Sequence, residues 1–317
     1  MLAYIVKRVA SLVPVLVVVS LAIFLIIHIT PGDPAATILG LDATGEEIAA
    51  LNEQMGFNRP LYQQYFSWVA NALRGNLGDS IFMKQPVTEA IAEHMGPTFT
   101  LAVLAQAIAL VLSVPLGIVS AYKKDTLVDG GITGLSLLGM AVPSFLMGMF
   151  LMLLFGVQLQ WVQVAGYKPL SAGLWEHIKY LILPSVALGM VQAALITRIT
   201  RSAMAEVLQA NFIRTIRAKG MKKGNLLIKH AFRNAALPVL TVIGQTFGTL
   251  ITGAVVVESL FNIPGLGQLI INAITRRDFA VIQGVVLFVT VLYIGVNLVV
   301  DLLYGVIDPR VNLSGKP

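Results

Sequence analysis

The sequence predicts an all-α protein with six transmembrane helices and both chain ends on the cytoplasmic side. Of the 317 residues, 56% are hydrophobic and 12% are charged, and this charged share is about half that of an ordinary soluble protein. The apolar residues gather into long runs separated by polar segments. The basic residues favour alternate polar segments, so one side of a membrane would collect most of them.

The first apolar run covers residues 9–29, which is long enough to cross a bilayer of roughly 30 Å. Lys7 and Arg8 precede it. A cleaved signal peptide is the alternative, but its apolar part would be shorter and a small-residue cleavage site would follow. Here the chain continues as TPGDP. We therefore predict an uncleaved first span.

Residues 30–96 are polar and form the longest stretch between predicted spans. Short amphipathic helices are predicted within this region at about 45–55, 60–73 and 86–95. The second of them is rich in aromatic residues, which suits a helix at the membrane interface. These aromatic residues are Tyr62, Tyr65, Phe66 and Trp68.

Residues 97–317 form the predicted core, which holds five more spans and one long polar segment at 200–236. The spans are predicted at about 97–121, 131–157, 178–199, 237–257 and 281–306. Loops are predicted at 158–177 and at 258–280, the latter with a turn at Ile263-Pro264-Gly265.

The distribution of charge fixes the predicted orientation. With six spans, the inner segments hold 15 of the 22 lysines and arginines, whereas the outer segments hold 11 of the 16 acidic residues. The positive-inside rule then places both termini and residues 200–236 in the cytoplasm, and residues 30–96 outside. Topology accounts for the net charge of +6, so we expect no nucleic-acid partner.

Segment 200–236 carries most of the inner cations and one acid, Glu206. Its apolar residues recur at helical spacing, which predicts an amphipathic helix over about 206–221. They are Met204, Val207, Leu208, Phe212 and Ile216. Gly220 supplies the positive φ that ends a helix, and a second helix is predicted from about Asn225 to Ala235. Together they predict a docking surface whose contacts are the apolar face and the turn at Gly220.

Several kinds of chemistry lack their sequence signatures. The sequence has no phosphate loop of the form GxxxxGK[ST], so we expect no ATP binding by this chain. It has no GxSxG or HExxH motif, no cysteine, and four histidines that are scattered, so neither an enzyme site nor a metal site is predicted. We expect a transport or docking role without catalysis and without a cofactor of its own.

Charged residues are almost absent from the middle of the predicted spans. Asp301 is the main exception, and it lies near the inner end of the sixth span. An ion-coupled secondary carrier usually places ionisable groups in mid-membrane, so this alternative is disfavoured. With no nucleotide site either, a transport function needs energy from a partner. The other alternative, a membrane-embedded enzyme, lacks polar residues converging at one depth.

Uncharged polar residues within the spans are candidates for the lining of a pathway. These candidates are Thr241, Gln245, Thr249, Thr252, Ser144 and Gln192. The first four share one face of the predicted fifth helix. Ordinary helix packing through small residues and weak hydrogen bonds is the alternative for each of them.

Residues 214–220, RTIRAKG, followed by HAFRNAALPV at 230–239, resemble the cytoplasmic EAA loop of peptide-type ABC importer permeases. That family includes dipeptide, oligopeptide, glutathione and nickel importers. Five further motifs resemble the first of its two permease subunits. They are HxxPGDPA at 28–35, RGNLGDS at 74–80, FNIPGLGQL at 261–269, RRDFAVIQGVVL at 276–287 and NLVVDLLYGVIDPR at 297–310. The general loop pattern has Glu-Ala-Ala where this chain has Arg214-Thr215-Ile216, and a proline where it has Arg233.

The resemblance implies a type I ABC importer permease fold and a set of partners. These partners are a second permease, two ATPase subunits that hold ATP and Mg, and an extracytoplasmic binding protein. The implied location is the inner membrane of a prokaryote. It further implies that segment 200–236 couples to the ATPases. The residues expected at this contact are Phe212, Arg214, Thr215, Arg217, Ala218, Lys219 and Gly220.

The external region is expected to dock the binding protein. The candidate contacts there are Tyr62, Tyr65, Trp68 and Arg74. Di- or oligopeptides are the implied substrates, and glutathione and nickel chelates remain alternatives.

Overall fold

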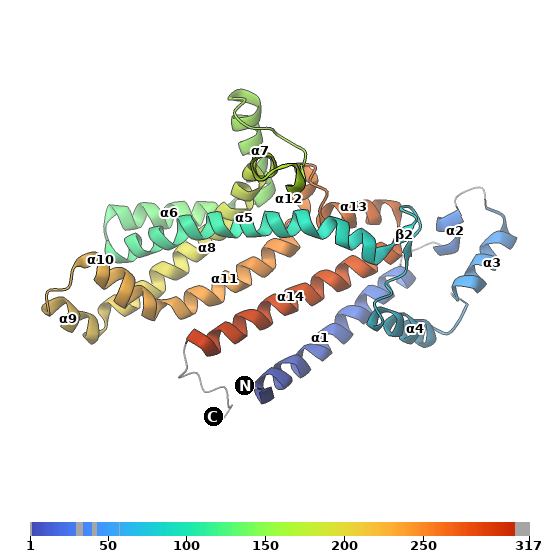
Figure 1. The fold of residues 1–317 in the computed structure, drawn as a ribbon, viewed down its shortest axis with the longest axis horizontal. Helices are drawn as coiled ribbons and strands as arrows, with labels where there is room; N and C mark the ends of the chain where they lie inside the picture. The colour runs from blue at the N-terminus through green and yellow to red at the C-terminus, as the bar shows by residue number, and fades with distance from the viewer. Residues whose placement is uncertain (1, 30–33, 40–42, 57, 308–317) are drawn as a thin grey trace. The chain divides into compact units, whose positions relative to one another are not determined.

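The computed structural model describes residues 2–29, 34–39, 43–56 and 58–307, which are mostly helical (Figure 1). The chain forms two compact units. One unit comprises Met1–Gly96 and Gly265–Ile294, and the other comprises Pro97–Pro264 and Gly295–Pro317. Parts of two motifs, residues 30–33 and 308–310, lie outside the described residues.

The first unit contains an antiparallel hairpin and several helices. The hairpin strands are β1 (Asp79–Ser80) and β2 (Gln85–Pro86), in which Ser80 pairs with Gln85. The helices wholly within the unit are α1 (Leu2–Ile29), α2 (Pro34–Leu39), α3 (Gly45–Met55), α4 (Leu61–Leu73) and α13 (Leu266–Arg276). Helices α5 (Val87–Tyr122) and α14 (Phe279–Ile307) begin here and continue into the second unit.

Helix α3 begins and ends with strong local signals. The Thr44 backbone N–H donates to the Glu47 carboxylate at 2.9 Å, and the Glu47 backbone N–H donates back to the Thr44 hydroxyl, which makes a capping box. The bonds from the Thr44 backbone N–H and hydroxyl hold the pKa of Glu47 below its usual value. Gly56, at φ 73°, ends the helix. The helix predicted at 45–55 is confirmed.

The core of the first unit lies where α5, α13 and α14 meet. Its buried residues are Val87, Ala90, Ile91, Leu266, Leu269, Ala273, Val281 and Val285. Residues 87–95 are helical as predicted, but they are the first turns of α5 and not a piece separate from the second span. The loop predicted at 258–280 is also wrong in part. Helix α13 occupies much of it and buries its apolar face in this core.

The second unit contains the remaining helices. They are α6 (Leu127–Ala141), α7 (Ser144–Leu151), η1 (Met152–Gln158), η2 (Leu170–Ala172), α8 (Leu174–Gln209), α9 (Asn211–Ala218), α10 (Lys223–Asn225), η3 (Leu226–Phe232), α11 (Arg233–Gly253) and α12 (Val255–Leu260). Helices α8 and α11 lie side by side (Figure 1). Ala109, Ala193, Ile196 and Val239 bury a core between α5, α8 and α11.

Four described helices are long and apolar enough to cross a membrane. They are Val87–Tyr122, Leu174–Gln209, Lys223–Gly253 and Phe279–Val300. The third predicted span, 131–157, is not one straight helix. Segments Leu127–Ala141 and Ser144–Gln158 are bent by 101° relative to each other. Pro143 lacks an N–H and disfavours a helical residue before it, and Val142 is extended with ψ 120°. The count of six spans stays a prediction.

Candidate functional site

The polar segment 200–236 folds as the end of α8, the short helix α9 and the beginning of the helix that becomes α11. Helix α8 continues beyond the predicted fourth span to Gln209 and ends where Ala210 turns extended, with ψ 146°. The continuous helix predicted over about 206–221 is therefore wrong. The apolar spacing continued across the break because α8 and α9 point their apolar residues into one cluster. Periodicity alone does not reveal a one-residue interruption.

The cluster beneath α9 fixes its position within the second unit. Ile213 of α9 is 1% exposed, and Met204 of α8 is fully buried. The buried members of the cluster are Ala121, Met204, Ile213, Leu226, Ala231 and Ala235, which come from α5, α8, α9, η3 and α11. Ile216 packs against it from the side. Most of the apolar face predicted as a contact surface is thus packed within this chain.

The opposite side of α9 and the turn after it are exposed. All seven predicted coupling residues lie there, namely Phe212, Arg214, Thr215, Arg217, Ala218, Lys219 and Gly220. Phe212 is 41% exposed, so it is the one member of the predicted apolar face on α9 that a partner can reach directly. The arrangement presents a short cationic helix on a packed apolar base.

Gly220 ends this exposed surface with a sharp turn. Its φ is 77°, and its N–H donates to the Arg217 carbonyl at 3.1 Å. This left-handed conformation favours glycine. A Cβ atom at this position would meet none of the described residues within 4 Å, so the backbone conformation, and not a close neighbour, selects glycine.

The second helix predicted in this segment, from about Asn225 to Ala235, is not separate. Residues Lys223–Gly253 form one helix with a π-helical stretch at Leu226–Phe232. The Lys223 ammonium lies 4.1 Å from the centre of the Tyr122 ring at the end of α5. A cation over an aromatic face is attracted by the ring quadrupole, so this contact ties the loop to α5.

Helix α11 carries a polar face that the other described residues leave largely uncovered. Gln245, Thr249 and Thr252 are exposed and Thr241 is half-buried, at the spacing expected for one face. The threonine hydroxyls donate to carbonyls of their own helix, at 3.0 Å from Thr241 to Leu237 and 2.8 Å from Thr249 to Thr246. Their hydrogen-bonding needs are therefore partly met even without water.

Two other pathway candidates fall on neighbouring helices. The Gln192 side-chain amide donates to the Thr249 hydroxyl at 3.2 Å, which joins α8 to the polar face of α11. Ser144 is half-buried and begins α7, directly after the bend at Pro143. The structure brings Gln192 and Thr249 together, whereas Ser144 belongs to a different helix from either of them.

The docking candidates on α4 and at its end, Arg74, divide into two kinds. Tyr65 exchanges a hydrogen bond with Ser20 of α1 at 2.9 Å, and the rings of Tyr65 and Trp68 lie 5.4 and 6.4 Å from that of Phe24. These two side chains hold α4 against α1. Tyr62 is 61% exposed and Arg74 is exposed, so both remain open to a partner.

Comparison with known proteins identifies the family. Residues 113–313 match the binding-protein-dependent transport system inner membrane component, and residues 1–102 match the N-terminal part of such components. The chain belongs to this family of transport permeases. A putative peptide transport system permease of Brucella abortus is 42% identical to it over 98% of this chain and 99% of its own length.

Other relatives match this permease equally fully. A dipeptide transport system permease of Alkalihalophilus pseudofirmus is 39% identical over 98% of this chain and 99% of its own. A glutathione transport system permease of Pectobacterium atrosepticum is 40% identical over the same shares. A chain of the MetNI methionine ABC transporter, solved in inward-facing conformations, has a TM-score of 0.55 and 13% identity, covering 69% of this chain and 96% of that chain. This likeness shows an ABC importer permease fold.

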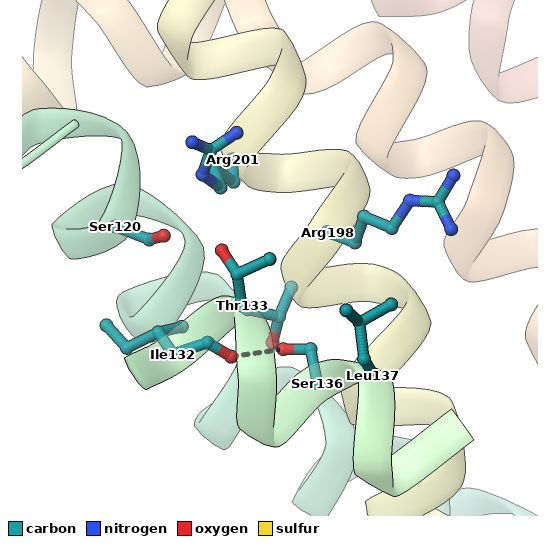
Figure 2. Close-up of a pocket in the computed structure, with 8 residues that line it drawn as sticks. Ser120, Ile132, Thr133, Ser136, Leu137, Arg198 and Arg201 are labelled. Atoms are coloured by element: carbon teal, nitrogen blue, oxygen red, sulfur yellow. Dashed lines mark hydrogen bonds between the residues drawn. The ribbon is translucent and has the colours of Figure 1, made fainter. Parts of the chain in front are cut away.

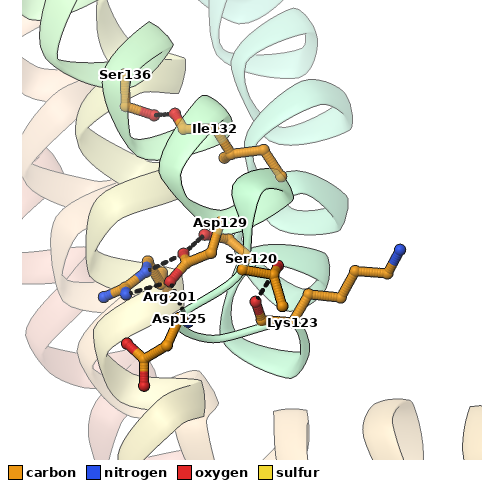
Figure 3. A network of polar contacts seen from close by, with 8 residues as sticks. Ser120, Lys123, Asp125, Asp129, Ile132, Ser136 and Arg201 are labelled. Atoms are coloured by element: carbon orange, nitrogen blue, oxygen red, sulfur yellow. Dashed lines mark hydrogen bonds and ion pairs between the residues drawn. The ribbon is translucent and has the colours of Figure 1, made fainter.

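A polar network in the permease, which sequence reasoning missed, joins three helices (Figure 3). Arg201 of α8 donates through Nε and Nη2 to both carboxylate oxygens of Asp129 at 2.6 Å. The Ser120 hydroxyl of α5 donates to Asp129 at 2.5 Å, and the Asp125 backbone N–H donates at 3.1 Å. The partners lie up to 72 residues apart, so their spacing carries no signal.

A cavity of about 170 Å³ lies next to this network, between α5, α6 and α8 (Figure 2). Its lining residues are Ser120, Ile132, Thr133, Ser136, Leu137, Thr197, Arg198 and Arg201. The Ser136 hydroxyl donates to the Ile132 carbonyl at 2.9 Å. In Figure 2 the Arg198 guanidinium points away from Thr133 and Ser136.

A second buried acid of the permease lies in α12. Glu258 is fully buried and accepts a hydrogen bond from the Thr98 hydroxyl of α5 at 2.6 Å. The sequence placed this residue at the end of a span but gave no sign of its partner. Within the described residues, no group of three or more histidine, aspartate or glutamate side chains is arranged to hold a metal ion.

Proposed function

We propose that this permease is one of two permease subunits of an ATP-driven importer for di- or oligopeptides in the cytoplasmic membrane of a prokaryote. The observation that carries the proposal is identity of about 40% over nearly the whole chain to relatives named for peptide and dipeptide transport. Such relatives match end to end, so the correspondence includes both the external-region motifs and the polar segment 200–236.

The proposed partners are a second permease, two ATPase subunits and an extracytoplasmic binding protein. ATP and Mg would be held by the ATPases, and this chain would bind no cofactor. The exposed side of α9, with the turn at Gly220, is the proposed contact with an ATPase. Helix α9 is short and cationic, and its buried residue Ile213 anchors it to the rest of the chain. These features fit a helix that binds in a groove of a partner.

The exposed polar face of α11 is the proposed contribution of this chain to the pathway. Polar side chains such as Gln245 are unfavourable against lipid, so this face needs a partner helix or water. Gln192 extends the face onto α8 through its bond to Thr249. A second permease facing this surface would enclose a polar path between the two chains.

Glutathione import is the second candidate function. The observation favouring it is the match to glutathione permeases at 40% identity in Pectobacterium atrosepticum and 38% in Shigella flexneri. Glutathione is itself a tripeptide, so an importer of one kind could also take up the other solute. Competition between glutathione and a dipeptide for uptake shows which of them is preferred. A di- or oligopeptide importer should take up labelled dipeptide with little inhibition by glutathione, and a glutathione importer should show the reverse preference.

The decisive test of the proposed function is purification of the tagged permease from its native membrane in mild detergent. We expect a second permease and ATPase subunits to copurify, and the complex to hydrolyse ATP faster when binding protein and peptide are added. An isolated chain that transports solute with an ion gradient and without ATPases would overturn the proposal.

A further inference from the structure

Two contacts hold α6 to α8, and a cavity lies between these contacts. At one end, Gly139 packs so tightly that a Cβ atom there would lie 3.1 Å from Ala194 Cβ. In the middle, the cavity lined by Ile132 and Thr197 leaves the two helices incompletely packed. At the other end, Asp129 and Arg201 form their bidentate pair.

The ion pair therefore carries the connection where apolar packing is missing. The Asp129 side chain is 5% exposed and that of Arg201 is 28% exposed, so the pair is largely shielded from solvent. Ser120 and the Asp125 N–H supply the carboxylate with two further donors. Bidentate, charge-assisted bonds fix both distance and orientation. Removing one partner leaves a buried charge uncompensated, which is strongly unfavourable.

The two helices joined by this pair lead to different places: α8 leads to α9, and α6 leads to the bend before α7. Helix α8 runs without interruption from Arg201 to Gln209 and, after Ala210, into α9. Helix α6 runs from Asp129 to the bend at Pro143, beyond which Ser144 begins α7. The pair is thus a direct connection between the helix that leads into α9 and the first turn of α6.

We propose that Asp129 and Arg201 are positioning residues for energy coupling: they lock the beginning of α6 to the extension of α8, so that movement of α9 reaches the α6–α7 bend. This rests on the proposed function, in which α9 contacts an ATPase. This role requires no contact of either residue with the substrate or ATP. Their role is to make α6 and α8 move together. Such coupling needs an unbroken physical connection to the site where the motion begins, which is α9 here.

The test compares Asp129→Asn, Arg201→Gln and the double variant in the complete importer, reconstituted with its partners and binding protein. Substrate transported per ATP hydrolysed is the readout. We expect each single variant to lower this ratio roughly tenfold, within the range of coupling effects between sites. The double variant should not lower the ratio further than either single variant, because each single change already breaks the same ion pair. Arg201→Lys, which keeps the charge and loses the bidentate geometry, should fall between.

The matched control is Arg198→Gln. Arg198 lies one turn from Arg201 on α8, is exposed, and has no acidic partner in the part of the chain that the structure describes. The Arg198→Gln substitution removes one positive charge from α8 but leaves the ion pair between α8 and α6 intact, so transport per ATP should stay unchanged. An equal loss in Arg198→Gln would overturn the proposal, since net charge on α8 would then be the cause.

A distance measurement separates coupling from simple stability. The chain contains no cysteine, so spin labels can be placed at Leu127→Cys on α6 and Glu206→Cys on α8, both exposed sites. In the otherwise unchanged importer, the label distance should be the same with and without ATP; in Asp129→Asn it should change on ATP addition. Assembled variants that keep both the distance and the transport ratio would overturn the proposal. A parent importer without ATPase partners would instead refute the proposed function.

Discussion

The Ser80 hydroxyl donates a hydrogen bond to Asp278 at 2.6 Å, across 198 residues of sequence, with both residues 2% exposed. The bond fastens the hairpin of β1 and β2 to the corner between α13 and α14. Asp278 also accepts from the Val281 N–H at 3.4 Å, which caps the first turn of α14. Two of the motifs that resemble peptide-type permeases, at 74–80 and 276–287, therefore meet in one buried contact.

Replacing Asp278 with alanine should destabilise the first unit by about 1–3 kcal/mol, because it removes a helix cap and leaves the buried Ser80 hydroxyl without its acceptor. The measurement is the thermal unfolding temperature of the purified permease in detergent. Asp79→Asn is the control, since Asp79 is adjacent and exposed. Equal unfolding temperatures for the Asp278 variant and the parent protein would contradict the prediction.

Helices α5 and α8 approach closely at Gly117. A Cβ atom there would lie 2.5 Å from Thr200 Cβ and 2.9 Å from the Thr197 carbonyl oxygen. Gly117→Ala should therefore force the helices apart and destabilise the second unit by roughly 1–3 kcal/mol, as overpacking does. The fraction of permease that remains monodisperse after heating in detergent measures this effect.

Gly130→Ala is the control for Gly117, because a Cβ atom at residue 130 of α6 would meet nothing within 4 Å in the described part of the chain. Alanine favours a helix over glycine, so this variant should be neutral or slightly stabilising. Changing Thr200 should not rescue Gly117→Ala, because the Thr197 carbonyl belongs to the backbone. A stable Gly117→Ala permease would show that α5 and α8 can separate here without cost.

Hydropathy predicted which segments form long apolar helices, but it could not predict where they break. Pro143 is visible in the sequence, yet a proline within an apolar run is compatible with either a kinked span or a 101° bend. Ala210 is a good helix former, so its extended backbone has no local signal. Packing of α8 and α9 on a shared cluster decides that break.

In the candidate site, too, some features could be predicted from the sequence and others depend on the fold. Gly220 was predictable because a left-handed turn favours one residue type, and its φ is 77°. Helical spacing predicted that Gln245, Thr249 and Thr252 share one face, whereas their exposure is seen only in the fold. By contrast, Asp129 and Arg201 lie on different helices, and nothing in a single sequence pairs them. Long-range polar contacts need the fold before they can be seen.

Gly220→Val should insert normally into the membrane but lose substrate-stimulated ATPase activity. A β-branched residue strongly disfavours φ 77°, so the turn after α9 would rearrange at a cost of about 1–2 kcal/mol or more. The measurement is ATP hydrolysis by the assembled importer with and without loaded binding protein. Full stimulated activity in this variant would refute the role of the turn.

Gly220→Asn separates backbone geometry from contact with a partner. Asparagine tolerates the left-handed region, and none of the residues that the structure describes comes within 4 Å of its Cβ position. If the turn geometry alone matters, most stimulated activity should return. If Asn fails as completely as Val, the partner surface must lie against Gly220 itself.

The polar face of α11 can be tested by cysteine accessibility, because the chain has no native cysteine. If the face lines an aqueous path, Gln245→Cys and Thr252→Cys should react with a charged thiol reagent. Leu138→Cys is the control. Leu138 is 65% exposed in this chain but apolar, so lipid should protect it. Substrate should slow the reaction at residue 245, and equal protection at all three positions would contradict a pathway role.

Substitutions of the exposed and of the packed docking candidates on α4 and at Arg74 should have different effects. Tyr62→Ala and Arg74→Ala should weaken stimulation by the binding protein without lowering stability, because both side chains are exposed and Tyr62 is 61% accessible. Trp68→Ala should lower the unfolding temperature instead, since its ring packs near Phe24 of α1. Titration of ATPase stimulation against binding-protein concentration, beside thermal unfolding, distinguishes them.

Tyr65→Phe sharpens this test because it removes one hydroxyl and keeps the ring against Phe24. The change deletes only the 2.9 Å bond to Ser20, which is largely buried in α1, so the expected cost is about 1 kcal/mol with unchanged binding-protein affinity. If Tyr65→Phe reduced affinity while leaving stability intact, the hydroxyl would have to contact the partner. The α1–α4 contact would then be a feature of the free permease that the binding protein replaces.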